Sequence, residues 1–284
     1  MNLSFIFLAL SCVALANPVP MEPTATNSTK TFRFNDYIEL DSSNHVVLRG
    51  PVTEDSVSRL IVNISKIHHD DIVLYITSPG GSVMAGQNLI QQINYLQKRG
   101  HKIYCVADIA ASMAFAILQA CDERYVTRSS LLMQHQMSVS MGGQYFNVKS
   151  RQLLLDAIEA DMTKRHAERM GLTEEEFTKK ITSDWWLYGE NAVQERAADA
   201  TVHVGCHGDL LEKTVQETVH VQTFFGSIDV DVVFSACPLA REPLEIKVPE
   251  RYLEALDMVS QIQLMSEVRH GISNHIENMV QTFF

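Results

Sequence analysis

The sequence predicts an α/β fold built around a mostly parallel sheet. Short apolar runs that are typical of buried strands, such as 72–76 and 103–106, alternate with longer segments of helical periodicity. This alternation is typical of right-handed β-α-β units. Three predicted strands also end in residues that suit chemistry, namely Gly80-Gly81, Ser112 and His135. Open α/β folds place their functional sites at such strand ends.

The core elements follow one another from residue 44 onward. Strands are predicted at 44–48, 72–76, 103–106, 124–126 and 131–134, and helices at 53–67, 84–98 and 112–121. A long helix is predicted at 147–170, after an irregular or strand-like segment at 137–146. Gly171 is expected to end that helix, and Thr173 with Glu176 predicts a capping box for the next one.

Residues 210–284 are predicted to form a C-terminal extension. Alternating apolar residues at 218–225 and 227–234 around Gly226 predict a β-hairpin. Pro249 then opens an amphipathic helix toward Phe283, which Gly271 is expected to interrupt. The polar face of this helix is poor in Lys and Arg, so packing on its own domain or on a neighbouring subunit is favoured over membrane binding.

Ser112 lies where an apolar strand turns into an apolar helix. The unpaired N–H groups and the dipole of a helix N-terminus suit a capping hydroxyl, and they equally suit a nucleophile that must become an alkoxide. Composition leaves both interpretations open. Gly80 and Gly81 end the preceding strand, where glycine lets the backbone approach a ligand and point an N–H at it.

Four segments, in this order, resemble the proteolytic subunit of Clp protease, a serine peptidase family with the ClpP/crotonase fold. They are Tyr75–Gly86 with its Gly-Gly pair, Ala110–Met113, Met133–Gln136, and Asp184–Leu187 followed by Glu190–Val193. The resemblance covers about 34–209. It implies a peptidase domain of repeated β-α-β units with a handle helix, here within 142–170.

The resemblance implies that Ser112, His135 and Asp184 are the catalytic residues. A serine hydroxyl is a poor nucleophile until a base accepts its proton, and an imidazole that titrates near neutrality is a suitable base. The base needs a carboxylate on its other nitrogen to fix its tautomer. Without the resemblance, His135 would be read as a structural strand-end histidine and Asp184 as a loop carboxylate.

The same resemblance assigns the groups around the nucleophile. The backbone N–H groups of Gly81 and Met113 are expected to form an oxyanion hole, and Gly80 and Ser82 are expected to contact the substrate. No metal and no cofactor are expected for this chemistry. The other ten histidines are interpreted as solvated surface residues.

The predicted function is therefore that of a serine endopeptidase that cleaves peptides or unfolded polypeptides inside a homo-oligomeric ring, heptameric by resemblance. Ser183 stands where the family usually has an arginine in the contacts between two rings, so a weak double ring is expected. Two alternatives stay open: a crotonase-like hydratase or isomerase of CoA thioesters, and a ring-forming scaffold without turnover.

A partner ATPase is a further implication of the resemblance. The family's unfoldase is a separate ATPase of the cytosol or organelle matrix, and this sequence contains no Gly-x-x-x-x-Gly-Lys-Ser or -Thr motif of its own. A member in a secretory lumen would have to work without that ATPase or with an unknown adaptor. We therefore expect peptide cleavage without ATP.

The N-terminus predicts a secretory route. Residues 3–16 are largely apolar and end in Ala14-Leu15-Ala16, which is typical of a cleaved signal peptide (1–16). Residues 17–33 are rich in Pro, Thr and Ser and are expected to be disordered. Glycosylation sequons start at Asn27 and Asn63. We therefore expect a secreted, lumenal or periplasmic protein, which would be a glycoprotein in a glycosylating host.

Cysteine spacing indicates neither a zinc site nor a redox motif. Cys105 and Cys121 fall on the apolar strand and helix beside Ser112 and are interpreted as core residues. Cys206 and Cys237 would be able to pair in an oxidising lumen.

The net charge argues against one class of partner. A formal charge of −11 does not provide the basic face that nucleic-acid phosphates require.

Overall fold

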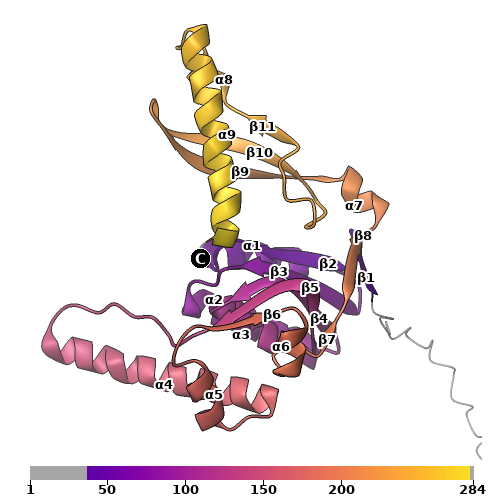
Figure 1. The fold of residues 1–284 in the computed structure, drawn as a ribbon, viewed down its shortest axis with the longest axis vertical. Helices are drawn as coiled ribbons and strands as arrows, with labels where there is room; N and C mark the ends of the chain where they lie inside the picture. The colour runs from indigo at the N-terminus through magenta and orange to yellow at the C-terminus, as the bar shows by residue number, and fades with distance from the viewer. Residues whose placement is uncertain (1–36, 282–284) are drawn as a thin grey trace, which may run out of the picture. The chain divides into compact units, whose positions relative to one another are not determined.

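A computed structural model describes residues 37–281 of the chain, and these belong to one compact unit that spans 34–284. The predicted signal peptide, the segment 17–33 and the sequon at Asn27 lie outside the described residues. The predicted α/β class is confirmed, because strands and helices alternate along the chain around a largely parallel sheet (Figure 1).

The central sheet has six strands, in the order β2-β3-β4-β5-β6 with β7 beside β5. Strands β2 to β5 and β7 are parallel, and β6 is antiparallel to β5. Their bounds are β2 His45–Arg49, β3 Asp71–Ser78, β4 Lys102–Ala111, β5 Glu123–Gln134, β6 Trp185–Tyr188 and β7 Ala200–Thr201. The prediction of separate strands at 124–126 and 131–134 is wrong, since β5 is continuous.

The helices α1 to α5 largely match the predicted ones. Thr53 caps α1, and Thr173 with Glu176 forms the predicted capping box of α5. The segment 137–144 forms no strand. The bounds are α1 Glu54–Ile64, α2 Val83–Lys98, α3 Met113–Gln119, α4 Tyr145–Met170, α5 Glu174–Lys180, α6 Glu190–Gln194 and α7 Gly208–Glu212.

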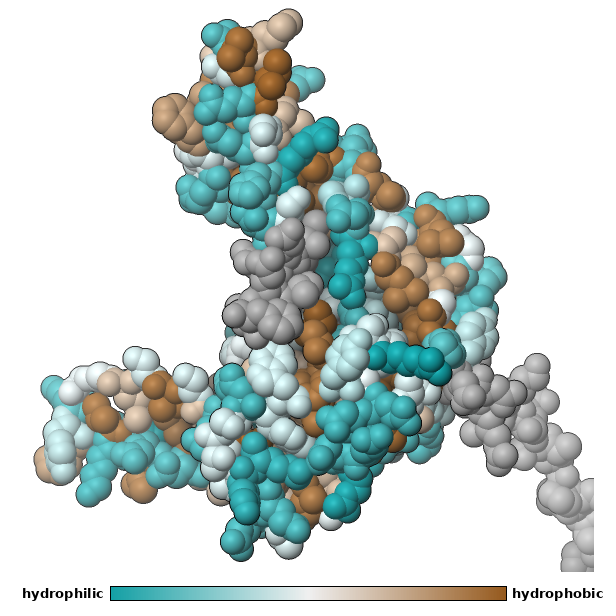
Figure 2. Space-filling view, in the orientation of Figure 1, coloured by the Kyte–Doolittle hydropathy of each residue, from teal (hydrophilic) through white to brown (hydrophobic). Residues whose placement is uncertain are grey.

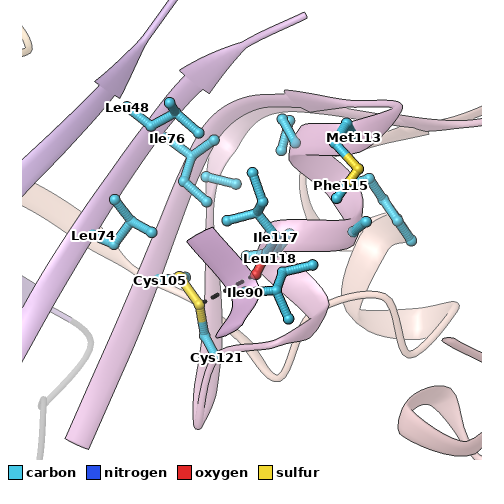
Figure 3. Packing of buried hydrophobic residues seen from close by; sticks show 14 of the residues in the cluster. Leu48, Leu74, Ile76, Ile90, Cys105, Met113, Phe115, Ile117, Leu118 and Cys121 are labelled. Atoms are coloured by element: carbon cyan, nitrogen blue, oxygen red, sulfur yellow. Dashed lines mark hydrogen bonds between the residues drawn. A yellow bond between two sulfur atoms is a disulfide. The ribbon is translucent and has the colours of Figure 1, made fainter. Parts of the chain in front are cut away.

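Side chains of β3 alternate between two apolar clusters on opposite faces of the sheet, as the period of two in a strand requires. Leu74 and Ile76 join the larger cluster, which includes Phe115 of α3 (Figure 3). Val73 and Tyr75 join a second cluster with residues of the small parallel pair β1 Tyr37–Leu40 and β8 His203–Cys206. Both faces of β3 are thus buried, as expected for a parallel strand.

All four cysteines of the described chain are in disulfides. Cys206 pairs with Cys237, which realises the possibility raised by the sequence. Cys105 and Cys121 are buried as predicted, but they also pair with each other (Figure 3). The interpretation of these two as plain core residues is therefore wrong in part. Their disulfide joins β4 to the end of α3, on either side of Ser112.

The C-terminal part contains the predicted hairpin. Strands β9 Thr214–Thr223 and β10 Gly226–Ser235 pair around Gly226, and β11 Glu245–Lys247 adds to β10. One face of the hairpin packs on the C-terminal helix in a third apolar cluster. Within the described residues, no helix is both long and apolar enough to cross a bilayer.

The predicted C-terminal helix is divided, but not at Gly271. It forms α8 Glu250–Leu253 and α9 Met258–Gln281, and Gly271 lies inside α9. A Cβ at Gly271 would lie 2.4 Å from Cγ1 of Val221 in β9. Glycine here permits close helix-to-sheet packing, and this packing outweighs its low helix propensity.

Candidate active site

Ser112 lies between β4 and α3 in a strained backbone conformation. Its φ of 53° and ψ of −119° lie in a region that residues other than glycine rarely adopt. Such conformations cost on the order of 1–3 kcal/mol and cluster at functional sites. The Ser112 side chain makes no capping hydrogen bond to α3. Of the two interpretations left open by the sequence, plain capping is therefore excluded.

His135 follows β5 and contacts Ser112 directly. Strands β4 and β5 are parallel and adjacent, with Ala111 opposite Met133, so the two residues leave the sheet at the same edge. The backbone N–H of Ser112 donates to the carbonyl of Met133 at 2.9 Å. His135 Nε2 lies 2.9 Å from Ser112 Oγ, a normal hydrogen-bond distance.

Asp184 precedes β6 and faces the other nitrogen of His135. Because β6 is antiparallel to β5 and pairs Trp185 with Gln134, Asp184 comes beside His135. The distance from Asp184 Oδ1 to His135 Nδ1 is 3.6 Å, which is longer than a hydrogen bond, and the Asp184 side chain is 57% exposed. The structure thus brings the three predicted residues together with the carboxylate at a loose distance. Such contacts commonly tighten only when substrate binds.

The Gly-Gly turn brings backbone against the nucleophile. A Cβ on Gly80 would lie 2.5 Å from the carbonyl oxygen of Ala111 and 2.8 Å from Ser112 Cβ. The carbonyl of Gly80 and the N–H of Ser82 both bond to Val52. In this parallel bridge, Gly81 lies between the two residues that bond to Val52, and its N–H and C=O point to the other side of the strand. The N–H of Gly81 is therefore directed away from Val52.

Two backbone donors are therefore available near Ser112. Gly81 lines the cavity next to Ser112, and Met113 is the first residue of α3, whose N–H has no intrahelical acceptor. Gly80 and Ser82, predicted to contact substrate, do not line this cavity, and the Ser82 hydroxyl instead caps α2 by accepting from Ala85 N–H.

A cavity of about 180 Å³ opens beside Ser112 and His135. Its apolar lining comes mainly from α3, α4 and α5, and its polar lining from the segment after β5 and from α4. Besides Gly81, Ser112, Met113 and His135, the lining residues are Val83, Gln134, Gln136, Met137, Ser138, Glu159, Met162, Thr163, His166, Phe177 and Ile181.

His166 and Glu159 of this lining were missed by the sequence interpretation. His166 is buried between Phe115 and Phe177, so its assignment to the solvated surface is wrong. Burial lowers the pKa of His166 to about 4, which keeps the ring uncharged at neutral pH. Its position four residues after Met162, on the stripe that α4 buries, was the available signal.

The first half of α4 does not pack on the domain. Leu153 and Leu154 in this half of the helix are 66% and 61% exposed. Only residues from Met162 onward are buried in this helix.

A second serine, histidine and aspartate meet on the hairpin. His220 Nδ1 lies 2.7 Å from Asp229 Oδ1, and its Nε2 contacts Ser227 Oγ. His220 and Asp229 are directly opposite in the ladder, and their side chains are about three fifths exposed. The trio does not line the cavity beside Ser112 and His135, and an exposed cross-strand polar pair accounts for it.

Comparison with known proteins fits this geometry. The family model for Clp protease matches residues 28–203, which is more than half of the chain. The chain belongs to the Clp protease family. The prediction of this family from four ordered segments is confirmed.

Two relatives within the Clp protease family show that the sequence identity to this chain is modest. The chain is similar to the ATP-dependent Clp protease proteolytic subunit 1 of Streptomyces avermitilis, with 27% identity over 182 residues, covering 61% of this chain and 83% of the relative. It is also similar to the ATP-dependent Clp protease proteolytic subunit 1 of Prochlorococcus marinus, with 30% identity over 169 residues, covering 57% of this chain and 84% of the relative.

Proposed function

We propose that this Clp protease family member is a serine endopeptidase that cleaves peptides or unfolded polypeptides. The observation that carries the proposal is the 2.9 Å contact between His135 Nε2 and Ser112 Oγ, at a serine held with positive φ. A strained turn between a strand and a helix can expose the hydroxyl of a nucleophilic serine at the edge of the sheet, and the surrounding structure offsets the cost of the strain. The test is covalent labelling of Ser112 by a fluorophosphonate probe, together with the Ser112→Ala variant.

In the proposed reaction, His135 accepts the Ser112 proton as the hydroxyl attacks the substrate carbonyl, and later donates it to the leaving amine. Asp184 stabilises the imidazolium and fixes its tautomer. The N–H groups of Gly81 and Met113 stabilise the oxyanion. A donor of this kind contributes about 3–4 kcal/mol when measured by its removal. No step requires a metal or an organic cofactor.

The two alternatives predict different chemistry at Ser112. A hydratase or isomerase of CoA thioesters has no use for a histidine bonded to a serine at this turn. A catalytically silent scaffold keeps the geometry but does not turn over. Labelling of Ser112 with loss of cleavage in Ser112→Ala supports the peptidase over both.

Assembly is the second part of the proposal: a homo-oligomeric ring, heptameric by resemblance, with a weak double-ring form. The support is the surface of α4, whose first half carries exposed apolar side chains (Figure 2). Phe146 is one of them and is 80% exposed. Exposed apolar patches of this kind mark association surfaces.

We expect particle mass and peptidase activity to fall together when the protein is diluted. Leu153→Glu should shift this transition to a higher concentration, because it places a charge in the proposed contact, whereas Lys149→Glu on the same helix should shift it less. Mass photometry with a parallel peptidase assay measures both. A monodisperse monomer with full activity contradicts the assembly.

Secretion is the third part of the proposal, with a signal peptide removed after residue 16. Two disulfides in the described chain support an oxidising compartment, and Asn63 of the second sequon is exposed on α1. We expect the mature protein from a glycosylating host to begin near Asn17 and to lose mass on deglycosylation. N-terminal sequencing that reads from Met1 in a cytosolic product contradicts this route.

An ATPase partner is not needed for the proposed chemistry. The relatives are named ATP-dependent, but the sequence here carries no nucleotide-binding motif of its own. Short peptides are therefore proposed substrates without ATP, and an unfoldase or adaptor would act only on folded substrates.

A further inference from the structure

The cavity beside Ser112 combines an apolar wall with a single carboxylate. The wall includes the apolar side chains Met113, Met162, Phe177 and Ile181, and neither Lys nor Arg lines it. The carboxylate belongs to Glu159, which is half-buried on α4. Cavities for whole small-molecule ligands measure roughly 300–1,000 Å³, so one of about 180 Å³ suits a single side chain.

Glu159 forms no ion pair with a lysine or arginine within the part of the chain whose side chains are described. Burial raises the pKa of Glu159, and the Met137 N–H and the charge of His135 act in the opposite direction. By contrast, Asp161 on the same helix pairs with Arg165. A partly desolvated carboxylate without a lysine or arginine partner is costly, and the cationic head group of a bound side chain would offset that cost.

The other buried polar groups of the cavity wall do not supply that cation. Gln134 Oε1 and His166 Nδ1 lack a hydrogen-bond partner within the described residues, and His166 is uncharged at neutral pH. An amide oxygen only accepts hydrogen bonds, and a neutral imidazole offers one acceptor. The polar lining therefore includes an unpaired acceptor, Gln134 Oε1, and contains neither lysine nor arginine.

Lysine and arginine match this lining. Both have a long apolar stem that packs on apolar surface and a head group that only donates. We infer that the cavity receives a lysine or arginine side chain that flanks the scissile bond, and that Glu159 selects it. The inference rests on the proposed function of Ser112 and adds a substrate class to it.

The test is digestion of a peptide library with varied residues on both sides of each potential cut, with cleavage sites mapped by mass spectrometry. The wild-type protein should enrich Lys and Arg at one flanking position by about tenfold over norleucine, a preference that corresponds to ~1.4 kcal/mol. Glu159→Gln should reduce this enrichment to about twofold or less, and Glu159→Lys should move the preference toward Glu and Asp. The matched control is Glu168→Gln, an exposed acid on the same helix, which should keep the wild-type preference.

Fluorophosphonate labelling of Ser112 in every variant separates the possible failures. A labelled wild-type protein that enriches aliphatic residues, or a labelled Glu159→Gln protein that keeps the basic preference, overturns the inference and leaves the peptidase proposal standing. A wild-type protein that is neither labelled nor cleaves the library overturns both. If Glu159→Gln melts earlier than wild type, the charge-reversed Glu159→Lys protein and its acidic preference decide the matter.

Discussion

A fluorophosphonate probe is expected to label Ser112 of the wild-type protein, and Ser112→Ala is expected to lose both the label and peptide cleavage. The hydroxyl is the only group in the proposed mechanism that forms the covalent acyl intermediate. Members of a triad act as a unit, so kcat should fall by a factor on the order of 10⁶. His135→Ala should lower kcat about as much. Probe labelling with peptide mapping and a fluorogenic peptide assay measure the two effects.

The hairpin trio provides the matched control for this experiment. Ser227 also touches a histidine that contacts an aspartate, but it lies on an exposed sheet face. Ser227→Ala should therefore keep both labelling and cleavage. Undiminished cleavage by Ser112→Ala, or a probe adduct mapped to Ser227, would refute the assignment of the nucleophile.

The convergence of the site was predictable from the sequence. Alternation of strands and helices implies parallel neighbours, and parallel neighbours end at one edge of the sheet. The pairing of β3 with β4 and of β4 with β5 indeed brings Gly81, Ser112 and His135 to that edge. Only the family resemblance predicted the position of Asp184. Strand β6 runs antiparallel to β5, and no local sequence pattern predicts that direction.

The backbone strain at Ser112 was not predictable from composition. A serine at a strand-to-helix turn is compatible with a cap and with a nucleophile, and the difference lies in a φ of 53°. That angle depends on the Met133 carbonyl that holds the Ser112 N–H and on the Gly80 backbone packed against it. Both are long-range contacts, which a local pattern does not contain.

The cysteine pair beside the site illustrates the same limit. Cys105 and Cys121 are 16 residues apart and match no spacing motif, yet α3 turns back along β4 and brings them together. His166 escaped notice for a related reason. A histidine in a helix is expected on the polar, exposed face, and only the tertiary packing of α4 buries the position of His166.

The division of the C-terminal helix was decided by one of two competing signals in the sequence, a capping aspartate and a helix-breaking glycine. Asp257 caps α9 by accepting from the Ser260 N–H at 2.8 Å, and Asp is a favoured residue for this role. Gly271 carried the more familiar breaking signal. Its tight contact with Val221 shows that tertiary packing decided the outcome.

Gly80→Ala is expected to damage both stability and activity, because two separate costs meet at this residue. Its φ of 88° is unfavourable for alanine, and the new methyl group would lie 2.5 Å from the Ala111 carbonyl oxygen and 2.8 Å from the Met113 nitrogen. Backbone strain and overpacking each cost on the order of 1–3 kcal/mol. We expect a loss of about 3 kcal/mol in the free energy of unfolding, or a fall on the order of 10 °C in Tm.

The same substitution should reduce kcat/KM even in the folded fraction. The methyl group can be accommodated only if Ser112 and the start of α3 move, and a displacement of ~1 Å can cost about 10²-fold in rate. Gly142→Ala is the matched control, since a Cβ there meets no atom within 4 Å, and it should leave Tm and rate near those of wild type. Calorimetry and the peptide assay on both variants measure these effects. A Gly80→Ala protein that melts with wild type and cleaves at the wild-type rate would show that the Gly-Gly turn does not press against the nucleophile.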